Sequence, residues 1–148
     1  MDELDKRIVN ILQKEGRLSI KNISERLFIT PPAVSQRLHS LEKNGSILNY
    51  QAHLNFPQAD LSIKAYIQLS LEPQQKEVFY PYIASVPNVL ECDCVTGAYS
   101  MMIKVVFEST QALDGFINEL QRFGRTNTQI VFSTPVQSRG FAFSEVSE

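Results

Sequence analysis

The segment ITPPAVSQRLHSLEKNG, residues 29–45, carries signals for both ends of one helix. Thr30 followed by Pro31 is typical of a helix N-cap with proline at the first helical position, and Asn44-Gly45 is typical of a helix end. Val34, Leu38 and Leu41 recur at helical spacing and predict a buried stripe. The opposite surface is polar and weakly basic: it contains Pro32, Gln36, His39, Ser40 and Lys43, with Ser35 and Arg37 on its flanks.

Two shorter helices are predicted before this segment. The apolar pattern predicts one helix from about Asp2 to Lys14 and another from Ser19 or Ile20 to Phe28. About three residues, 28–30, separate the second helix from the third, and residues 47–54 fit a short strand or wing. This arrangement predicts a winged helix-turn-helix, and a plain three-helix bundle is the alternative.

In a helix-turn-helix the third helix reads the major groove of DNA. Gln36 suits a bidentate contact with adenine, and the flanking Ser35 belongs to the same surface. The remaining candidate DNA-binding residues are His39 and Ser40 for base edges, Pro32 for a thymine methyl group, and Thr30, Arg37 and Lys43 for phosphates. Arg37 has a competing interpretation, an ion pair inside the fold with Glu42 or Glu25.

The net charge of −2 at pH 7 hides an asymmetry along the chain. Residues 1–50 hold eight basic and six acidic side chains, a charge of +2, which leaves −4 for the rest. Between Arg17 and Lys43 there are five basic residues and two acidic ones. A local excess of this kind matters more to a phosphate-facing surface than the charge of the whole chain.

The second half of the chain predicts an α+β domain with the order β-α-β-β-α-β. Strands are predicted at 63–71, 89–95, 100–107 and 128–136, with helices around 78–86 and 113–123, the first of them interrupted by Pro81. This is the ferredoxin-like arrangement. We expect a helix-turn-helix domain at 1–50, a connector at 51–60 and the ferredoxin-like domain at 61–148.

Several classes of protein are disfavoured. No apolar run approaches the roughly 20 residues that span a bilayer, and the acidic start differs from a secretion signal, so a cytoplasmic protein without membrane contact is expected. An enzyme is not expected, because the two histidines, His39 and His53, both fall in the first half and no nucleophile–base spacing or phosphate-binding glycine loop is present.

Cys92 and Cys94 are one residue apart in a predicted strand and therefore point to one face. Buried packing in a reducing compartment is the favoured interpretation. A metal or redox sensor is the alternative, although a metal site usually needs four ligands and no histidine lies near this pair in the sequence. We therefore expect no metal and no cofactor.

Across nearly its whole length the sequence resembles the Lrp/AsnC family of transcriptional regulators. The motifs that carry the resemblance are 4–8 (LDKRI), 16–19 (GRLS), 29–38 (ITPPAVSQRL), 41–47 (LEKNGSI), 96–100 (TGAYS) and 103–105 (IKV). It implies a sequence-specific regulator of double-stranded DNA whose βαββαβ domains pair into dimers, often four dimers in a ring. It also implies an amino-acid effector bound where dimers meet, near Thr96, Gly97, Ala98, Tyr99 and Ser100.

Ala98 and Ser100 stand where many family members carry acidic residues, so this pattern is more similar to the AsnC branch. A glycine turn exposes backbone groups that can bind a carboxylate and an ammonium group. Because Ala98 and Ser100 carry no charge, a neutral amino acid is expected, and the resemblance to the AsnC branch suggests asparagine. Two alternatives stay open: the loop is a plain hairpin turn with Tyr99 packed against a neighbour, or the protein is an architectural DNA-binding protein without an effector.

Overall fold

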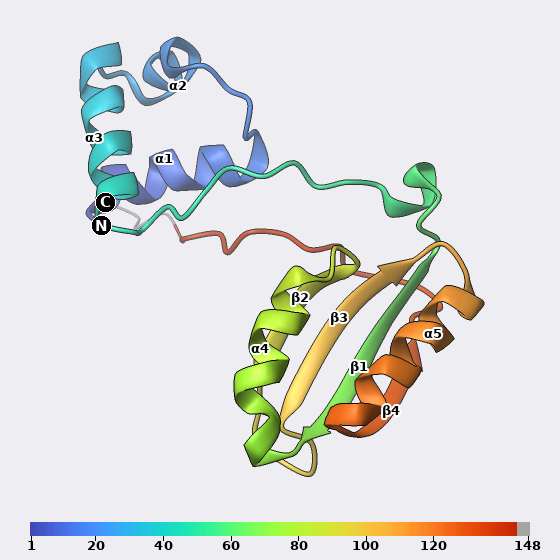
Figure 1. Cartoon of the computed structure of the whole chain (residues 1–148). Coiled ribbons are helices and arrows are strands. Elements are labelled where there is room, and N and C mark those ends of the chain that lie inside the picture. The colour runs from blue at the N-terminus through green and yellow to red at the C-terminus, as the bar shows by residue number, and fades with distance from the viewer. Residues whose placement is uncertain (145–148) are drawn as a thin grey trace. The chain divides into compact units, whose positions relative to one another are not determined.

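Residues 1–144 are described by a computed structural model of the chain. Contacts divide it into two units: residues 1–53 with the end of the chain from Val136, called here the helical unit, and Leu54–Pro135, called the α+β unit. The helical unit consists of helices and loops, and the α+β unit is a sheet with helices packed on it (Figure 1). None of the helices described combines the length and apolar composition needed to cross a bilayer.

The helical unit confirms the three predicted helices, and each start is capped by a side chain. The helices are α1 (Glu3–Lys14), α2 (Ile20–Leu27) and α3 (Pro31–Lys43). Asp2, Ser19 and Thr30 accept hydrogen bonds from backbone N–H groups of the first turns, which satisfies donors that have no partner inside the helix. A core of Ile8, Ile23, Leu27 and Val34 lies between the helices.

The α+β unit has the predicted β-α-β-β-α-β order. Its elements are β1 (Ile63–Leu71), α4 (Lys76–Ser85), β2 (Val89–Cys94), β3 (Met101–Phe107), α5 (Thr110–Leu120) and β4 (Gly124–Ile130), with 3₁₀ turns at Phe56–Ala59, Pro73–Gln75 and Gln121–Phe123. The sheet is antiparallel in the order β2-β3-β1-β4. Pro81 lies within α4 and does not end it.

Both helices of this unit pack on one face of the sheet. Alternate residues of β1 and β3, such as Ile67 and Ile103, point into a core shared with Phe79 of α4 and Phe116 of α5. Residues between them, such as Tyr66, belong to the opposite face. Neither α4 nor α5 covers that face.

Two expected strands differ from the structure. The fourth was predicted at 128–136 on its apolar side chains, but β4 is Gly124–Ile130, and Phe132 beyond it is fully exposed. The side chains of β4 are mostly polar, so its sequence does not predict a strand; the strand forms because β4 pairs with β1.

Residues 47–54 form no strand, since no second strand in residues 1–144 pairs with them. The Tyr50 hydroxyl instead donates to Glu42 at 2.9 Å, and burial raises its pKa to about 12.

The chain from Val136 was expected in the C-terminal domain and instead groups with the helices. The amide of Asn10 donates to the carbonyl of Phe143 and accepts from its N–H, both at 2.9 Å. Gln13 donates to the carbonyl of Phe141 at 2.8 Å. Side chains of α1 bind backbone here, so the tail needs no hydrophobic period of its own, and periodicity could not reveal this contact.

Gly124 starts β4 against the end of β1, and its φ is 153°. A Cβ there would lie 1.8 Å from the carbonyl oxygen of Ser70. Gly124→Ala is therefore expected to lower the free energy of unfolding by at least about 2 kcal/mol. Gly115→Ala, inside α5 with no atom within 4 Å of the new Cβ, is expected to raise it by up to about 1 kcal/mol.

Urea unfolding of both variants measures these changes. Equal midpoints for Gly124→Ala and the unsubstituted chain would show that β4 does not depend on this close approach.

Candidate nucleic-acid interface and effector loop

The solvent-facing side of α3 is the candidate DNA-reading surface. On its other side, α3 packs into the helical unit through Val34 and Leu41, both almost fully buried. The exposed residues include all the predicted DNA contacts except Arg37, and we call them the α3 surface: Thr30, Pro32, Ser35, Gln36, His39, Ser40 and Lys43. They form a continuous polar face on one rigid helix, as a groove-reading element requires.

The turn before α3 has the compact geometry of a helix-turn-helix. α2 ends at Leu27, and Phe28 follows in the left-handed conformation with φ 55°. Its N–H donates to the carbonyl of Ser24, and Thr30 then begins the next helix. Phe28 itself is 93% exposed, so its conformation ends α2 but its ring packs into no core.

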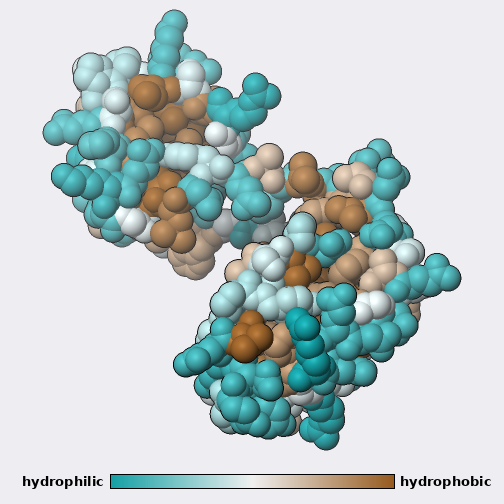
Figure 2. Space-filling model, in the orientation of Figure 1, coloured by the Kyte–Doolittle hydropathy of each residue, from teal (hydrophilic) through white to brown (hydrophobic). Residues whose placement is uncertain are grey.

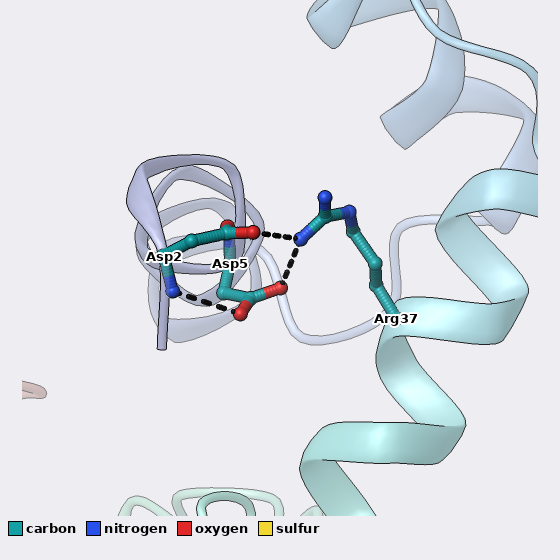
Figure 3. A network of polar contacts seen from close by, with 3 residues as sticks. All are labelled: Asp2, Asp5 and Arg37. Carbon is teal, nitrogen blue, oxygen red and sulfur yellow. Dashed lines mark hydrogen bonds and ion pairs between the residues drawn. The ribbon is translucent and has the colours of Figure 1, made fainter.

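Arg37 lies in a network inside the helical unit (Figure 3). Its Nη1 donates to Asp2 Oδ2 at 2.6 Å and to Asp5 Oδ1 at 2.8 Å. Asp2 and Asp5 also form a reciprocal capping box at the start of α1. The hydrogen bond from the Asp5 N–H, and then the one from Arg37, hold the pKa of Asp2 below its ordinary value of 3.8.

An internal pair for Arg37 was the competing expectation, but the partners expected for it were Glu42 or Glu25. The Asp2-x-x-Asp5 spacing was the available signal, because an acidic N-cap with an acidic residue three positions later is typical of a capping box. Its link to α3 needed the tertiary fold. Arg37 thus joins α1 to α3, and its guanidinium is less free for a phosphate than the sequence suggested.

Other cations of this unit are also paired. Arg26 binds Glu15, with Nη2 at 2.8 Å from Oε2, and Lys21 lies 3.9 Å from Glu25. Lys43 and Arg17 form no ion pair with any residue in the described part of the chain. Arg7 and Lys14 likewise form no ion pair within residues 1–144, and Lys43 is the one of these four that lies on the α3 surface.

The loop 96–100 has the expected glycine turn, with Gly97 at φ 115°. Thr96, Gly97 and Ala98 are exposed, and Tyr99 is half-buried under the guanidinium of Arg125, 5.4 Å from the ring centre. Ser100 is used differently from the expectation: its hydroxyl accepts from the N–H of Leu71 at 3.0 Å and donates to the carbonyl of Leu69 at 3.4 Å. The Ser100 hydroxyl thus connects the loop to the backbone of β1.

Cys92 and Cys94 share one face of β2, as their spacing predicts, but they are less buried than expected. Cys92 is half-buried and Cys94 exposed, because β2 is an edge strand. Burial, with smaller effects from Asp93 and Cys94, raises the pKa of the Cys92 thiol to about 11. A thiol that stays protonated at neutral pH is a poor nucleophile, which disfavours a redox sensor.

Comparison with known proteins connects these features. Residues 1–47 match the model of a winged helix-turn-helix DNA-binding domain, and residues 64–141 match that of the Lrp/AsnC ligand binding domain. The HTH-type transcriptional regulator LrpC of Bacillus subtilis is 29% identical over 133 residues, 90% of this chain and 92% of that protein. Its solved structure has a TM-score of 0.88 at 28% identity and covers 93% of this chain and 99% of its own.

Two further relatives extend the comparison. The leucine-responsive regulatory protein of Escherichia coli is 28% identical over 145 residues, 93% of this chain and 88% of that protein. A transcriptional regulator of Neisseria meningitidis, solved as a complex with L-Met, has a TM-score of 0.87 at 26% identity, with 93% and 94% of the two chains covered.

The two units therefore define a class of protein in which a winged helix-turn-helix DNA-binding domain is joined to an α+β ligand-binding domain. The relatives are similar over both units, and nearly the full length of each is covered. The chain belongs to the Lrp/AsnC family.

Arg37→Gln removes the link between α1 and α3, and we expect it to lower the melting temperature by about 2 to 5 °C at pH 7. The Asp2 pKa is lowered in the folded state, so this stabilisation is present above about pH 3.8 and is lost as the pH falls below it. The gap between the two proteins should therefore close in acid. Thermal unfolding followed by circular dichroism at pH 7 and pH 3 measures it.

Lys43→Gln is the matched control, since Lys43 is an exposed cation on the same helix. If both substitutions change the melting temperature equally, the network does not hold the two helices together.

Proposed function

We propose that this chain is a sequence-specific DNA-binding transcriptional regulator whose assembly or affinity for DNA responds to an amino acid. The observation that carries the proposal is the α3 surface, a polar helix face presented by a capped helix-turn-helix. Family membership supports the same function. A purely architectural protein, without effector or sequence preference, is the alternative.

On the α3 surface, Gln36 is the residue proposed to read a base. It is exposed, it lies on the opposite side of the helix from the buried Val34 and Leu41, and its amide can pair with adenine through both a donor and an acceptor. Lys43 is proposed to bind a DNA phosphate. Arg17 is proposed as a second phosphate contact, because it also forms no ion pair within residues 1–144. Arg37 is proposed as a positioning residue that sets the angle of α3 through Asp2 and Asp5.

We further propose that the functional form is at least a dimer, with a tetramer of dimers as the larger assembly. One short helix contacts few base pairs, so useful specificity needs two helices on a two-fold site. The face of the sheet opposite α4 and α5 is a surface that a second copy can cover. Exposed large apolar side chains also lie outside the sheet: Leu48 and Leu54 follow α3 and Phe132 follows β4, each at least 63% exposed. Brown patches interrupt the hydrophilic surface in Figure 2.

The proposed effector site is the loop 96–100. The side chain of Ser100 is left out of the proposed site, because its hydroxyl bonds to the backbone of β1. Gly97 leaves backbone N–H and C=O groups open at a positive φ, which suits the two charged ends of a free amino acid. Tyr99 is proposed as a wall. The amino acid is proposed to be neutral, such as asparagine, and the similarity of Gly97-Ala98-Tyr99-Ser100 to the AsnC branch supports that choice. A purely regulatory role without catalysis fits these sites.

The DNA proposal predicts different effects for two residues of the α3 surface. Gln36→Ala is expected to relax preference at one base position by roughly 1 to 3 kcal/mol, because a bidentate contact is lost. Lys43→Ala is expected to weaken binding to all sequences alike and to reduce the salt slope by about 1. Binding to the protein's own promoter region and to random DNA, at several salt concentrations, separates the two effects.

Lys76→Ala, an exposed cation on α4, is the control and should leave binding unchanged. An unchanged preference profile for Gln36→Ala would remove Gln36 as a base contact. Equal affinity of the unsubstituted protein for promoter and random DNA would favour the architectural alternative. Light scattering of the same samples measures the oligomeric state.

The effector proposal predicts a thermal shift. An amino acid at a hundred times its dissociation constant should stabilise the folded assembly by about 2.7 kcal/mol. Gly97→Val should abolish the shift, because a β-branched residue resists the φ of 115° and changes the direction of the backbone groups. A panel of the twenty amino acids at millimolar concentration is the measurement.

Gly45→Val is the matched control. Gly45 also has a positive φ, 76°, and open space around its Cβ position, but it lies in the helical unit. It should cost stability and keep the shift. If none of the amino acids raises the melting temperature, the loop is not an effector site.

A further inference from the structure

We propose that Cys92, Cys94 and Met101 form a binding site for one soft monovalent cation of the Cu⁺ type. All three line a single cavity of about 420 Å³ in the α+β unit, between α4 and the edge strand β2. The other walls come mainly from apolar side chains, including Tyr80 and Ile83 of α4. The sulfur atoms are the soft donors that this cavity offers.

The register of the hairpin brings the three residues together. Cys94 pairs directly with Met101 across β2 and β3, and Cys92 pairs with Ile103. Side chains of paired residues and of residues two apart lie on one face, so all three sulfurs lie on the side of α4. Met102 is the next residue on β3, and its side chain belongs to the opposite face. The sequence alone does not identify Met101 as a ligand, because only the pairing of β2 with β3 places it opposite Cys94.

The spacing of the two cysteines suits a shared ion better than a disulfide. Residues two apart on a strand have Cα atoms about 6.6 Å apart with parallel Cβ directions, at the upper limit for a disulfide. Both cysteines are free. Metal–sulfur bonds of about 2.3 Å place the sulfurs of a trigonal site about 4 Å apart, which rotation of the two side chains toward each other can reach.

The donor set selects the ion. Two thiolates and a thioether favour Cu⁺, whereas zinc is usually held by four nitrogen, sulfur or carboxylate ligands. Among residues 1–144, no three His, Cys, Asp or Glu side chains group to hold a metal, so the two thiols depend on Met101 for a third ligand. Binding would release two thiol protons to solvent and leave a site with a charge of −1, with no change of oxidation state.

The test is a competition for Cu⁺ between the reduced, full-length protein and a chromogenic Cu⁺ chelator under anaerobic conditions. We expect one Cu⁺ per chain and a thiolate-to-copper absorption band. Cys92→Ser and Cys94→Ser should each lose at least about tenfold in affinity, and so should Met101→Leu, because a thioether is replaced by an isosteric hydrocarbon. Zn²⁺ should compete poorly.

Met102→Leu is the matched control and should bind as the unsubstituted chain does. Cys94 is exposed, so its serine variant tests the site without disturbing the core. Failure to take Cu⁺ from the chelator, or binding that survives both cysteine substitutions, would refute the site. Equal affinities for Met101→Leu and Met102→Leu, or equal competition by Zn²⁺, would refute the assignment of three sulfur ligands.

Discussion

The α+β unit depends on β1, the strand that pairs on both sides. It bonds to β3 over residues 63–69 and to β4 over residues 65–71, so the sheet is assembled around it. Its odd-numbered residues from Ala65 to Leu71 are buried, and the ones between them are half-buried. A slip of one residue would turn Ile67 and Leu69 away from the core. That alternation favours one register between β1 and β3, and β3 in turn pairs with β2.

The sequence predicted those parts of the fold that carry a local signal. Capping residues and apolar periods located α1, α2 and α3, alternation located β1, and a glycine turn between β-prone segments located β2 and β3. β4 was misplaced because its side chains are mostly polar and its partner is distant in sequence. The wing failed as a strand for the opposite reason: its residues favour β structure but have no partner in the described chain.

The candidate site divides in the same way. Which residues of α3 are exposed followed from the period of the helix, and Gly97 was identified because a hairpin turn needs its conformation. The partners of polar side chains did not follow. Arg37 binds Asp2 and Asp5, more than 30 residues away, and the hydroxyl of Ser100 binds the backbone of β1. Hydrogen bonds of this kind have no period in the sequence, and only the fold reveals them.

The contact between the end of the chain and α1 has a consequence for how the protein is made. Asn10 and Phe143 are separated by 133 positions, so the side-chain hydrogen bonds of α1 with this segment form only after residue 143 has been synthesised. The α+β unit, Leu54–Pro135, is synthesised in full before that moment. The helical unit is therefore completed after the α+β unit, which can already be folded by then.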